Sequence, residues 1–305
     1  MKKIITLVMA ITLVFTLAAT LGACSPAPTA TTAPASVAPE TTAPAETAAP
    51  SATPAEQKVL KVGLECAYAP FNWTDQEQKN GAVAIDSAPG FAGGYDIEIA
   101  KKIAEGLGRK LEIHKIEWTG LVPAAQTGVI DLIIAGMSPT AEKKESVDFT
   151  DKYYNSNIVL IVKKGGKFEG AKSLDDLAGA KLTAQLGTTH YDIFLQQIKK
   201  ADKKAAMDDF GAMRVALATG VIDGYVAEKP EGLMAMAKAP ETYFMLDFAA
   251  GSGFDTNDDN VSVAIGMKKG QPELAEAINK ILSGITPEQR KQMMDDAVKN
   301  SLLVK

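Results

Sequence analysis

The residues best suited to hold a small charged molecule stand beside predicted strand ends and a predicted helix start. Gly187, Thr188 and Thr189 come directly before a predicted helix, where backbone N–H groups can point at an anion. Glu228 lies at the end of a predicted strand, and strand ends are where α/β proteins collect ligand-binding groups. A loop carboxylate that faces water is the other interpretation of Glu228. The sequence thus offers donors for an anion and a carboxylate for a cation.

Catalytic chemistry has few candidates in this chain. The two histidines are His114, in a predicted strand, and His190, directly after Thr189. His190 can lie near the anion-binding residues, although its place at a helix start favours a surface histidine. No nucleophile motif, metal-ligand spacing or cofactor fingerprint occurs, and the glycine-rich residues 90–94 are a predicted loop. We therefore predict no catalytic residue, no bound metal and no cofactor.

Length and charge narrow the class of protein. A chain of 305 residues, 46% hydrophobic and 23% charged, allows one large domain or two lobes of moderate size. The formal net charge of -5 argues against a nucleic-acid partner, which needs a basic face. Of the two cysteines, Cys24 lies in a targeting segment, so the folded part holds the lone thiol of Cys66. A lone thiol is usually inert and buried, and we assign Cys66 no chemistry.

The chain begins with a targeting signal. Two lysines precede a mainly apolar stretch that closes with small residues before Cys24, which predicts a signal peptide over 1–23. Residues 21–24 (LGAC) resemble the lipobox of bacterial lipoproteins, so we expect Cys24 to be the acylated first residue, carrying palmitate. An uncleaved membrane helix is the alternative. Both interpretations place the remainder outside the cytoplasmic membrane, anchored to it.

The segment over 24–57 continues from this cysteine with mostly Ala, Pro, Thr, Ser and Glu. It lacks the large apolar residues that offset the entropy of ordering a chain. Its prolines stiffen it, which is typical of an extended spacer. We expect a disordered tether that holds a folded domain off a membrane surface, rather than an insertion without a role.

Hydrophobic periodicity predicts alternating strands and helices from residue 58 onward. The predicted strands are 59–64, 111–118, 131–137, 157–162, 181–186, 221–227, 243–248 and 261–267. The predicted helices are 95–107, 121–126, 173–177, 188–198, 210–219, 230–238, 272–282 and 287–299. This alternation predicts the α/β class with parallel sheets. Residues 74–93 form a predicted surface loop at the cleft rim or a lobe edge.

An ordered set of motifs resembles the family 3 solute-binding proteins, the periplasmic or lipoprotein receptors of polar amino acid ABC transporters. The motifs are VGLECAYAPF at 62–71, GYDIEIA at 94–100, WTGLVPA at 118–124, GVIDLIIAGMS at 128–138, VDFTDKYY at 147–154, LGTT at 186–189 and IDGYVAE at 222–228. Each motif alone is weak, whereas the series in this order is specific. The resemblance runs from about residue 60 to the C-terminus.

The resemblance implies a two-lobed periplasmic-binding-protein-like fold of type II, with the ligand in the cleft between the lobes. The first lobe would comprise 58–154 and 249–305, and the second lobe 155–248. The chain would cross between them near 154–157 and near 247–253. A monomer is expected.

The resemblance also implies how an α-amino acid would be held at its carboxylate. Backbone N–H groups at Thr188 and Thr189 would donate to it, together with an arginine of the family whose position here is Lys143. A lysine offers a compact charge without the planar fork of a guanidinium. This departure leaves open a ligand other than a standard amino acid, and a solvated lysine in a charged run is the alternative for Lys143.

For the ammonium, the resemblance assigns the Gly136 carbonyl, the Ser138 hydroxyl and the carboxylate of Glu228, where the family usually has aspartate. For the side chain, it implies a sandwich between Tyr68 and Trp118. Phe71 is expected to belong to the core instead.

Glu65 lies where some members of the family place a carboxylate that faces a basic side chain. A solvated loop glutamate is an equally supported alternative. If Glu65 and Glu228 both face the cleft, a basic amino acid is the preferred ligand, because a second ligand cation pairs with the second carboxylate.

These features predict a transport receptor that closes on a polar, possibly basic, amino acid and delivers it to the permease of an ABC transporter. A small-acid dehydratase-like enzyme and a ligand sensor on the same fold are the alternatives.

Overall fold

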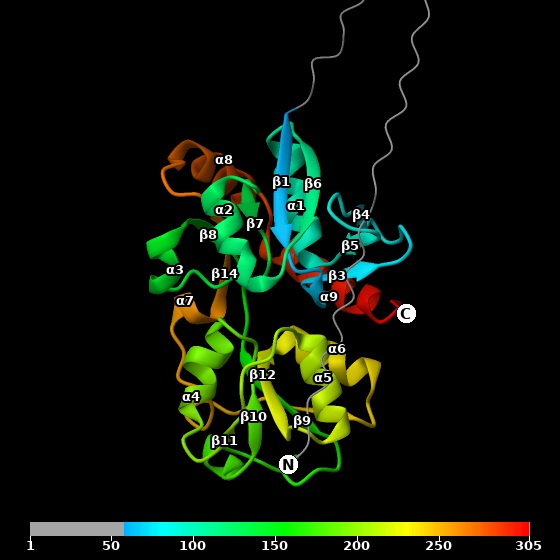
Figure 1. Ribbon diagram of the computed structural model, residues 1–305, viewed down its shortest axis with the longest axis vertical. Coiled ribbons are helices and arrows are strands. Elements are labelled where there is room, and N and C mark those ends of the chain that lie inside the picture. The colour runs from blue at the N-terminus through cyan, green and yellow to red at the C-terminus, as the bar shows by residue number, and fades with distance from the viewer. Residues whose placement is uncertain (1–57, 305) are drawn as a thin grey trace, which may run out of the picture. The chain divides into compact units, whose positions relative to one another are not determined.

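Two five-stranded sheets organise the part of the chain that this computed structural model describes, residues 58–304 (Figure 1). The first sheet has the order β6-β1-β7-β14-β8 and the second the order β11-β10-β12-β9-β13. The first comprises β1 (Val59–Leu64), β6 (Lys110–Lys115), β7 (Leu132–Ile133), β8 (Asp148–Asn155) and β14 (Ser262–Met267). The second comprises β9 (Ile158–Lys163), β10 (Lys181–Thr183), β11 (Asp202–Lys203), β12 (Gly224–Glu228) and β13 (Tyr243–Leu246). We call the parts built on them the first and the second lobe.

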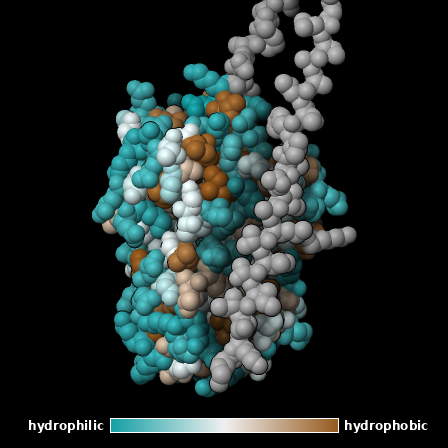
Figure 2. Space-filling model, viewed as in Figure 1, coloured by the Kyte–Doolittle hydropathy of each residue, from teal (hydrophilic) through white to brown (hydrophobic). Residues whose placement is uncertain are grey.

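The predicted signal peptide, the lipidation site at Cys24 and the tether over 24–57 lie outside the described residues. Over residues 58–304, no helix combines the length and the apolar character that crossing a bilayer requires. The face seen in Figure 2 is mostly hydrophilic, with apolar side chains standing among polar ones.

Helices cover the first sheet where their apolar residues repeat at helical spacing. α1 (Tyr95–Gly106) buries the isoleucines at 97, 99 and 103 and begins after Gly94, whose φ is 129°. A Cβ at Gly94 would lie 2.2 Å from the Phe71 carbonyl oxygen, so only glycine fits this helix start. The other helices of this lobe are α2 (Leu121–Thr127), α3 (Ala141–Ser146), α7 (Asp258–Val261), α8 (Pro272–Ser283) and α9 (Pro287–Ser301).

Helix boundaries in the second lobe follow clear capping signals. α5 (Phe210–Thr219) begins at Asp209, whose side chain accepts from the Ala212 N–H, and ends at Gly220 in the left-handed region. The predicted helix over 188–198 is a π-helical turn, η3 (His190–Phe194), followed by the short α4 (Leu195–Gln197). α6 (Lys229–Lys238) follows β12 directly and has proline in its first turn.

The sheets are mixed, although the sequence predicts parallel ones. β14 pairs antiparallel with β7 and β8, and β9 pairs antiparallel with β12 and β13. Both exceptions are the strands that follow a crossing between the lobes. A strand that the chain enters from the other lobe starts at the cleft, where its neighbours end, and therefore runs against them.

The chain crosses from β8 to β9 through Ser156 and Asn157, and it returns between β13 and β14. The predicted first lobe includes the residues from 249 onward. Phe254 instead packs edge-on against Phe194 of the second lobe, with ring centroids 5.7 Å apart. The return therefore comes nearer α7, because an aromatic side chain holds this loop on the second core.

Residues 67–93 form a small antiparallel sheet where the sequence predicts mainly a surface loop. Its order is β2-β3-β5-β4, from β2 (Ala67–Tyr68), β3 (Asn72–Asp75), β5 (Phe91–Gly93) and β4 (Val83–Ala84). An isolated bridge between Ile85 and Ile113 joins it to the edge of the first sheet at β6. Strands this short carry too few residues for an alternating pattern, which is why the periodicity did not predict them.

Candidate ligand-binding cleft

Polar groups from the ends of both sheets meet in one small cavity. Its free volume is about 10 Å³, and every predicted ligand-binding residue except Glu65 lines it. The lining residues are Tyr68, Trp118, Gly136, Ser138, Lys143, Gln185, Thr188, Thr189, His190 and Glu228. The topology thus brings together groups that lie far apart in the sequence, and Gln185 and His190 join the predicted set.

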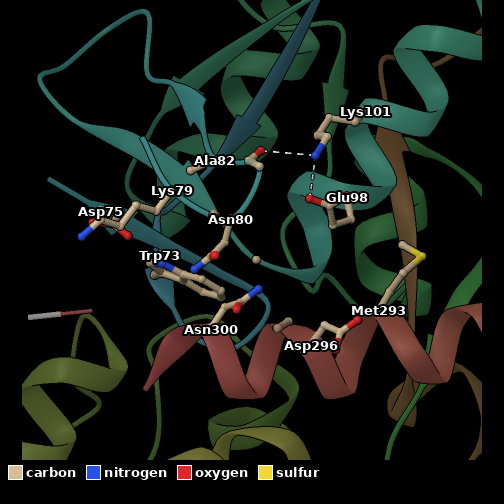
Figure 3. A pocket seen from close by; sticks show the side chains of 14 residues that line it. Trp73, Asp75, Lys79, Asn80, Ala82, Glu98, Lys101, Met293, Asp296 and Asn300 are labelled. Carbon is tan, nitrogen blue, oxygen red and sulfur yellow. Dashed lines mark hydrogen bonds and ion pairs between the residues drawn. The ribbon is translucent and has the colours of Figure 1, made fainter. Parts of the chain in front are cut away.

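Larger hollows of about 380 and 570 Å³ lie on the first lobe, but their charged groups are mutually paired or exposed. Figure 3 shows the smaller of these between residues 73–82, α1 and α9. Lys101 lies there 2.7 Å from Glu98 Oε1 and donates to the Gly81 carbonyl oxygen. Buried polar groups that converge from several elements mark a binding site better than volume alone.

The anion-binding side of the cavity combines a loop and a lysine. Thr188 and Thr189 are both buried and follow Gly187, whose φ of 67° turns the chain a few residues after β10. The Thr188 hydroxyl donates to the Gln185 carbonyl oxygen at 2.7 Å, which fixes this turn. Burial lowers the pKa of Lys143 while the nearby Glu142 and Asp192 raise it. Lys143 lines the cavity and is half-buried, so it is not one of the fully solvated charges of its run.

The cation-binding side is built on Glu228, which is 4% exposed at the end of β12. Its side chain lies 2.8 Å from His190 Nε2. Burial raises the pKa of Glu228 to about 8, and burial together with Lys143 lowers the pKa of His190 to about 3. The short separation alone would indicate an ion pair. We favour a neutral acid beside a neutral imidazole, because the angles satisfy no hydrogen bond and no described group compensates either charge.

The interpretation of His190 as a surface histidine is wrong. Its side chain is buried, with the ring edge-on to Phe210 at a centroid separation of 6.0 Å. The helix over 188–198 was predicted from the local pattern, but the side chains that cover His190 come from α5 and β12, which are distant in sequence. The signal that could have indicated burial is the position itself, one residue after the predicted anion-binding loop.

Glu65 is buried rather than solvated, yet it does not line the cavity. Its Oε1 accepts from Gln185 Nε2 at 2.8 Å, and its Oε2 has no hydrogen-bond partner. Burial raises the pKa of Glu65 to about 8 despite the Gln185 hydrogen bond. Gln185 thus separates Glu65 from the cavity, and a ligand can reach this carboxylate only by displacing the amide. The adjacent Cys66 is buried with a pKa raised to about 12 by burial, as expected of an inert thiol.

The aromatic wall is more crowded than the predicted sandwich. The Tyr68 ring stacks on Phe71 at 4.9 Å and on Phe210 at 4.2 Å between centroids, so both of its faces are covered. Phe71 is fully buried, in keeping with its expected place in the core. Trp118 donates from Nε1 to the Gly187 carbonyl oxygen at 3.0 Å. Phe210 must move if a ligand side chain is to lie against Tyr68.

A buried hydrogen-bond network holds the Gly136 backbone in place, and nothing in the sequence indicated this network. The Gly136 N–H donates to the Tyr153 hydroxyl at 3.1 Å, and that hydroxyl donates to Asp96 Oδ1 at 2.7 Å. Asp96 also accepts from Asn72 Nδ2 at 2.8 Å. Three separate segments therefore hold the Gly136 backbone in place. The neighbouring Ser138 donates weakly to the Asn260 carbonyl oxygen at 3.4 Å.

Contacts between the lobes close the cavity. Gln185 and Gly187 of the second lobe meet Glu65 and Trp118 of the first. A free volume of about 10 Å³ holds roughly one water molecule. Since an amino acid is far larger, the lobes or the lining side chains must move apart to admit one.

Comparison with known proteins gives this geometry a context. Residues 60–296 match the bacterial extracellular solute-binding proteins, family 3. The chain is 34% identical to the arginine-binding extracellular protein ArtP of Bacillus subtilis over 43% of its length and 46% of that protein. It is 26% identical to the L-cystine-binding protein TcyJ of Escherichia coli over 79% of its length and 82% of that protein.

A solved structure with a similar fold is an amino acid ABC transporter substrate-binding protein, AbpA, from Streptococcus pneumoniae, bound to L-arginine. The TM-score is 0.69 at 28% identity, covering 80% of this chain and 96% of the other. The family match spans most of the described residues, and this two-lobed structure confirms the predicted type II fold. The chain belongs to the bacterial extracellular solute-binding proteins of family 3.

Proposed function

We propose that this protein is the lipid-anchored receptor of an ABC importer, which binds an amino acid in the cleft and delivers it to the permease. The observation that carries the proposal is that one buried cavity has an anion-binding side and a cation-binding side. Lys143 and the loop at Thr188 and Thr189 stand on one side, and Glu228 on the other. An α-amino acid presents its carboxylate and ammonium with this same polarity. The amino acid-binding relatives support this class of ligand.

Closure of the two lobes is the proposed binding motion. The Gln185–Glu65 and Trp118–Gly187 contacts join the lobes and must break when the cleft opens. A ligand that binds both lobes replaces these contacts and stabilises the closed form.

For specificity we propose a preference for basic amino acids. Lys143 matches the α-carboxylate and Glu228 the α-ammonium, which leaves Glu65 without a charged partner. A guanidinium or ammonium that displaces the Gln185 amide from Glu65 would supply one. A neutral side chain can offer Glu65 only a hydrogen bond, which is weaker than a charged one.

A thermal-shift panel of the standard amino acids tests the class and the preference together. Ligands that bind only the folded state raise the melting temperature with increasing concentration. We expect the largest rise with arginine or lysine, and Glu65→Gln should weaken these ligands while sparing glutamine. Glutamate or aspartate as the best ligand, or an unchanged response of Glu65→Gln, would contradict the basic preference. No response to any amino acid would contradict the function.

An enzyme of the small-acid dehydratase kind is the second candidate, favoured by the buried contact between His190 and Glu228. A carboxyl group that stays protonated near neutral pH can act as a general acid. We expect no turnover of prephenate-like acids. Steady product formation that disappears in His190→Gln or Glu228→Gln would show that the protein is an enzyme and would contradict the receptor function.

The proposed anchor has its own test. Mass spectrometry of the mature N-terminus should find acylated Cys24 as the first residue, in the membrane fraction. An intact peptide that spans Ala23 and Cys24 in that fraction would contradict lipidation. If no importer subunit copurifies with the protein, the result would favour a tethered ligand sensor over a transport receptor. Size-exclusion chromatography should show the expected monomer.

A further inference from the structure

A second group of potential ligands lies outside the cleft, at the edge of the first sheet. Asp86, Glu112 and His114 each offer one ligand-type atom, and these three atoms lie within 4.8 Å of one another. None of the three belongs to the cavity between the lobes. Their spacing in the sequence matches no metal-binding motif, which is why the sequence predicted none.

Two independent segments hold the three residues in register. Glu112 and His114 alternate on β6 and therefore point to the same face of the strand. Asp86 comes from the small sheet: its N–H donates to the Ile113 carbonyl oxygen at 2.8 Å, beside the bridge between Ile85 and Ile113. One residue further on, the Ser87 hydroxyl accepts from the Lys115 N–H at 2.9 Å. Backbone contacts thus fix where Asp86 stands, whatever its side chain does.

His114 supplies the observation that points to a bound ion. Its Nε2 atom is buried without a hydrogen-bond partner, and its side chain is only 15% exposed. Glu112 Oε2 lies 4.0 Å from this nitrogen, which is too far for a hydrogen bond. A buried imidazole nitrogen without a partner costs free energy that a hydrogen bond or a metal ion would recover. The other Glu112 oxygen lies 3.4 Å from the exposed Lys110 ammonium.

The donor set selects a class of ion. Two carboxylates and a neutral imidazole favour a divalent cation, and the imidazole favours Zn²⁺ and similar transition metals over Mg²⁺ and Ca²⁺. For tetrahedral Zn²⁺ with ligands at about 2.1 Å, neighbouring ligand atoms stand about 3.4 Å apart. The 4.0 Å between His114 and Glu112 closes to this value by a small side-chain rotation. Asp86 is exposed, so its carboxylate is free to turn toward the ion.

We propose that Asp86, Glu112 and His114 bind one divalent transition-metal ion, Zn²⁺ by preference, with water as the fourth ligand. The ion links residues 83–87 to β6 and so clamps the small sheet to the first lobe. Two residues before this segment, the Gly81 carbonyl oxygen accepts from Lys101 of α1. The ion is structural, and its site is separate from the amino acid cleft.

Isothermal titration of ZnCl₂ into the chelator-treated mature protein tests the site, in a buffer free of amino acids and without a histidine tag. We expect one Zn²⁺ per chain, with affinity lowered about tenfold or more in Asp86→Asn and in His114→Gln. Glu105→Gln, which changes an exposed carboxylate on α1, is the matched control and should bind as the parent does. Undiminished binding in both ligand variants, or no binding by the parent, would overturn the proposal.

Hydrogen exchange gives a readout that a nonspecific surface ion would not reproduce. Zn²⁺ should slow amide exchange over 83–87 and 112–115 in the parent and in Glu105→Gln, but not in Asp86→Asn. MgCl₂ at the same concentration should leave the exchange unchanged. Because Asp86 is exposed, Asp86→Asn keeps the fold, and an equal Zn²⁺ effect in this variant would refute the clamp even if His114→Gln unfolded.

Discussion

Two buried glutamates of the second lobe stand three residues apart and have opposite surroundings. Glu231, which is fully buried in α6, accepts from Arg214 Nη1 at 2.7 Å and from the Tyr225 hydroxyl at 3.0 and 3.2 Å. Glu228 is 4% exposed at the end of β12, forms no ion pair with a lysine or arginine among the described residues, and lies 2.8 Å from the neutral imidazole of His190. One carboxylate has its partners built into the fold, and the other does not.

The difference separates a structural carboxylate from a binding one. Burying a charge is costly unless it is paired. Burial raises the pKa of Glu231, but its ion pair and hydrogen bonds with Arg214 and Tyr225 oppose that rise. At Glu228 burial raises the pKa to about 8, which keeps the group mostly protonated at neutral pH. A ligand ammonium would supply the missing cation. The comparison therefore predicts that changes at Glu231 affect stability and that changes at Glu228 affect binding.

The largest effect is expected on stability, from Glu231→Gln. This change leaves Arg214, whose side chain is 22% exposed, without its charged partner, and breaking a buried pair costs up to about 3–5 kcal/mol of unfolding free energy. Urea unfolding of the ligand-free protein measures this loss. Glu228→Gln is the matched control from the same lobe and should cost far less, since the group is already neutral. Equal losses in the two variants would remove the distinction between the two glutamates.

Glu228→Gln should instead have its main effect on affinity. An amide cannot pair with the α-ammonium, and truncating a buried charged partner typically costs about 2–5 kcal/mol of binding free energy. Calorimetric titration with the best ligand of the thermal-shift panel measures the loss. Glu231→Gln, where it remains folded, should retain the parent's affinity. Tight binding by Glu228→Gln would show that the ammonium lies elsewhere.

The comparison also shows what the sequence could and could not predict. Residues at strand ends, such as Glu228 and Thr188, were predictable because α/β topology gathers those ends at the cleft. The burial of His190 was not, because its cover comes from Phe210 on a distant helix. The local sequence pattern also could not distinguish Glu228 from Glu231, because the partners of each carboxylate come from tertiary contacts.

The same limit applies to the support of the site and to the small sheet. Tyr153 and Asp96 are 57 residues apart, yet their hydrogen bond holds Gly136. The residue pattern predicted the helix α1. It could not predict that Asp96 of this helix meets Tyr153 of β8, because that contact is made only in the folded protein. In the small sheet, strands of two to four residues gave no alternation to detect, so its pairing with β6 appeared only in the structure.

A smaller effect is expected from pH. If the ligand requires ionised Glu228, binding releases the proton that this group holds below about pH 8. Affinity should then rise about fivefold from pH 7 to pH 8 and about twofold more before it levels off above about pH 9. Glu228→Gln should abolish this rise. Titrations across this range in buffers of different ionisation enthalpy measure both the affinity and the released proton.

The stability of the ligand-free protein should change with pH in the opposite direction. The folded pKa of Glu228 is raised from 4.5 to about 8, so its contribution is fully present below pH 4.5 and is lost as pH rises through 8. The pKa of Glu65 is also raised from 4.5 to about 8, so its contribution to stability is lost over the same pH interval. Urea unfolding should therefore show the parent losing stability over this interval more steeply than Glu228→Gln. A parent that grew more stable toward pH 8 would contradict protonated carboxyl groups in the cleft.

The smallest effect is expected at the anion-binding side, from Lys143→Arg. Lys143 provides a partly desolvated point charge, and the Thr188–Thr189 loop provides the other donors in the proposed site. A guanidinium adds a second parallel hydrogen bond to the carboxylate, which should strengthen binding by about 1 kcal/mol, or roughly fivefold. Lys144→Arg is the control, because Lys144 lies 2.6 Å from Asp259 outside the cavity. Weaker binding by Lys143→Arg, with Lys144→Arg unchanged, would mean that the cavity has room only for the compact ammonium and that the carboxylate depends on the loop rather than on a fork.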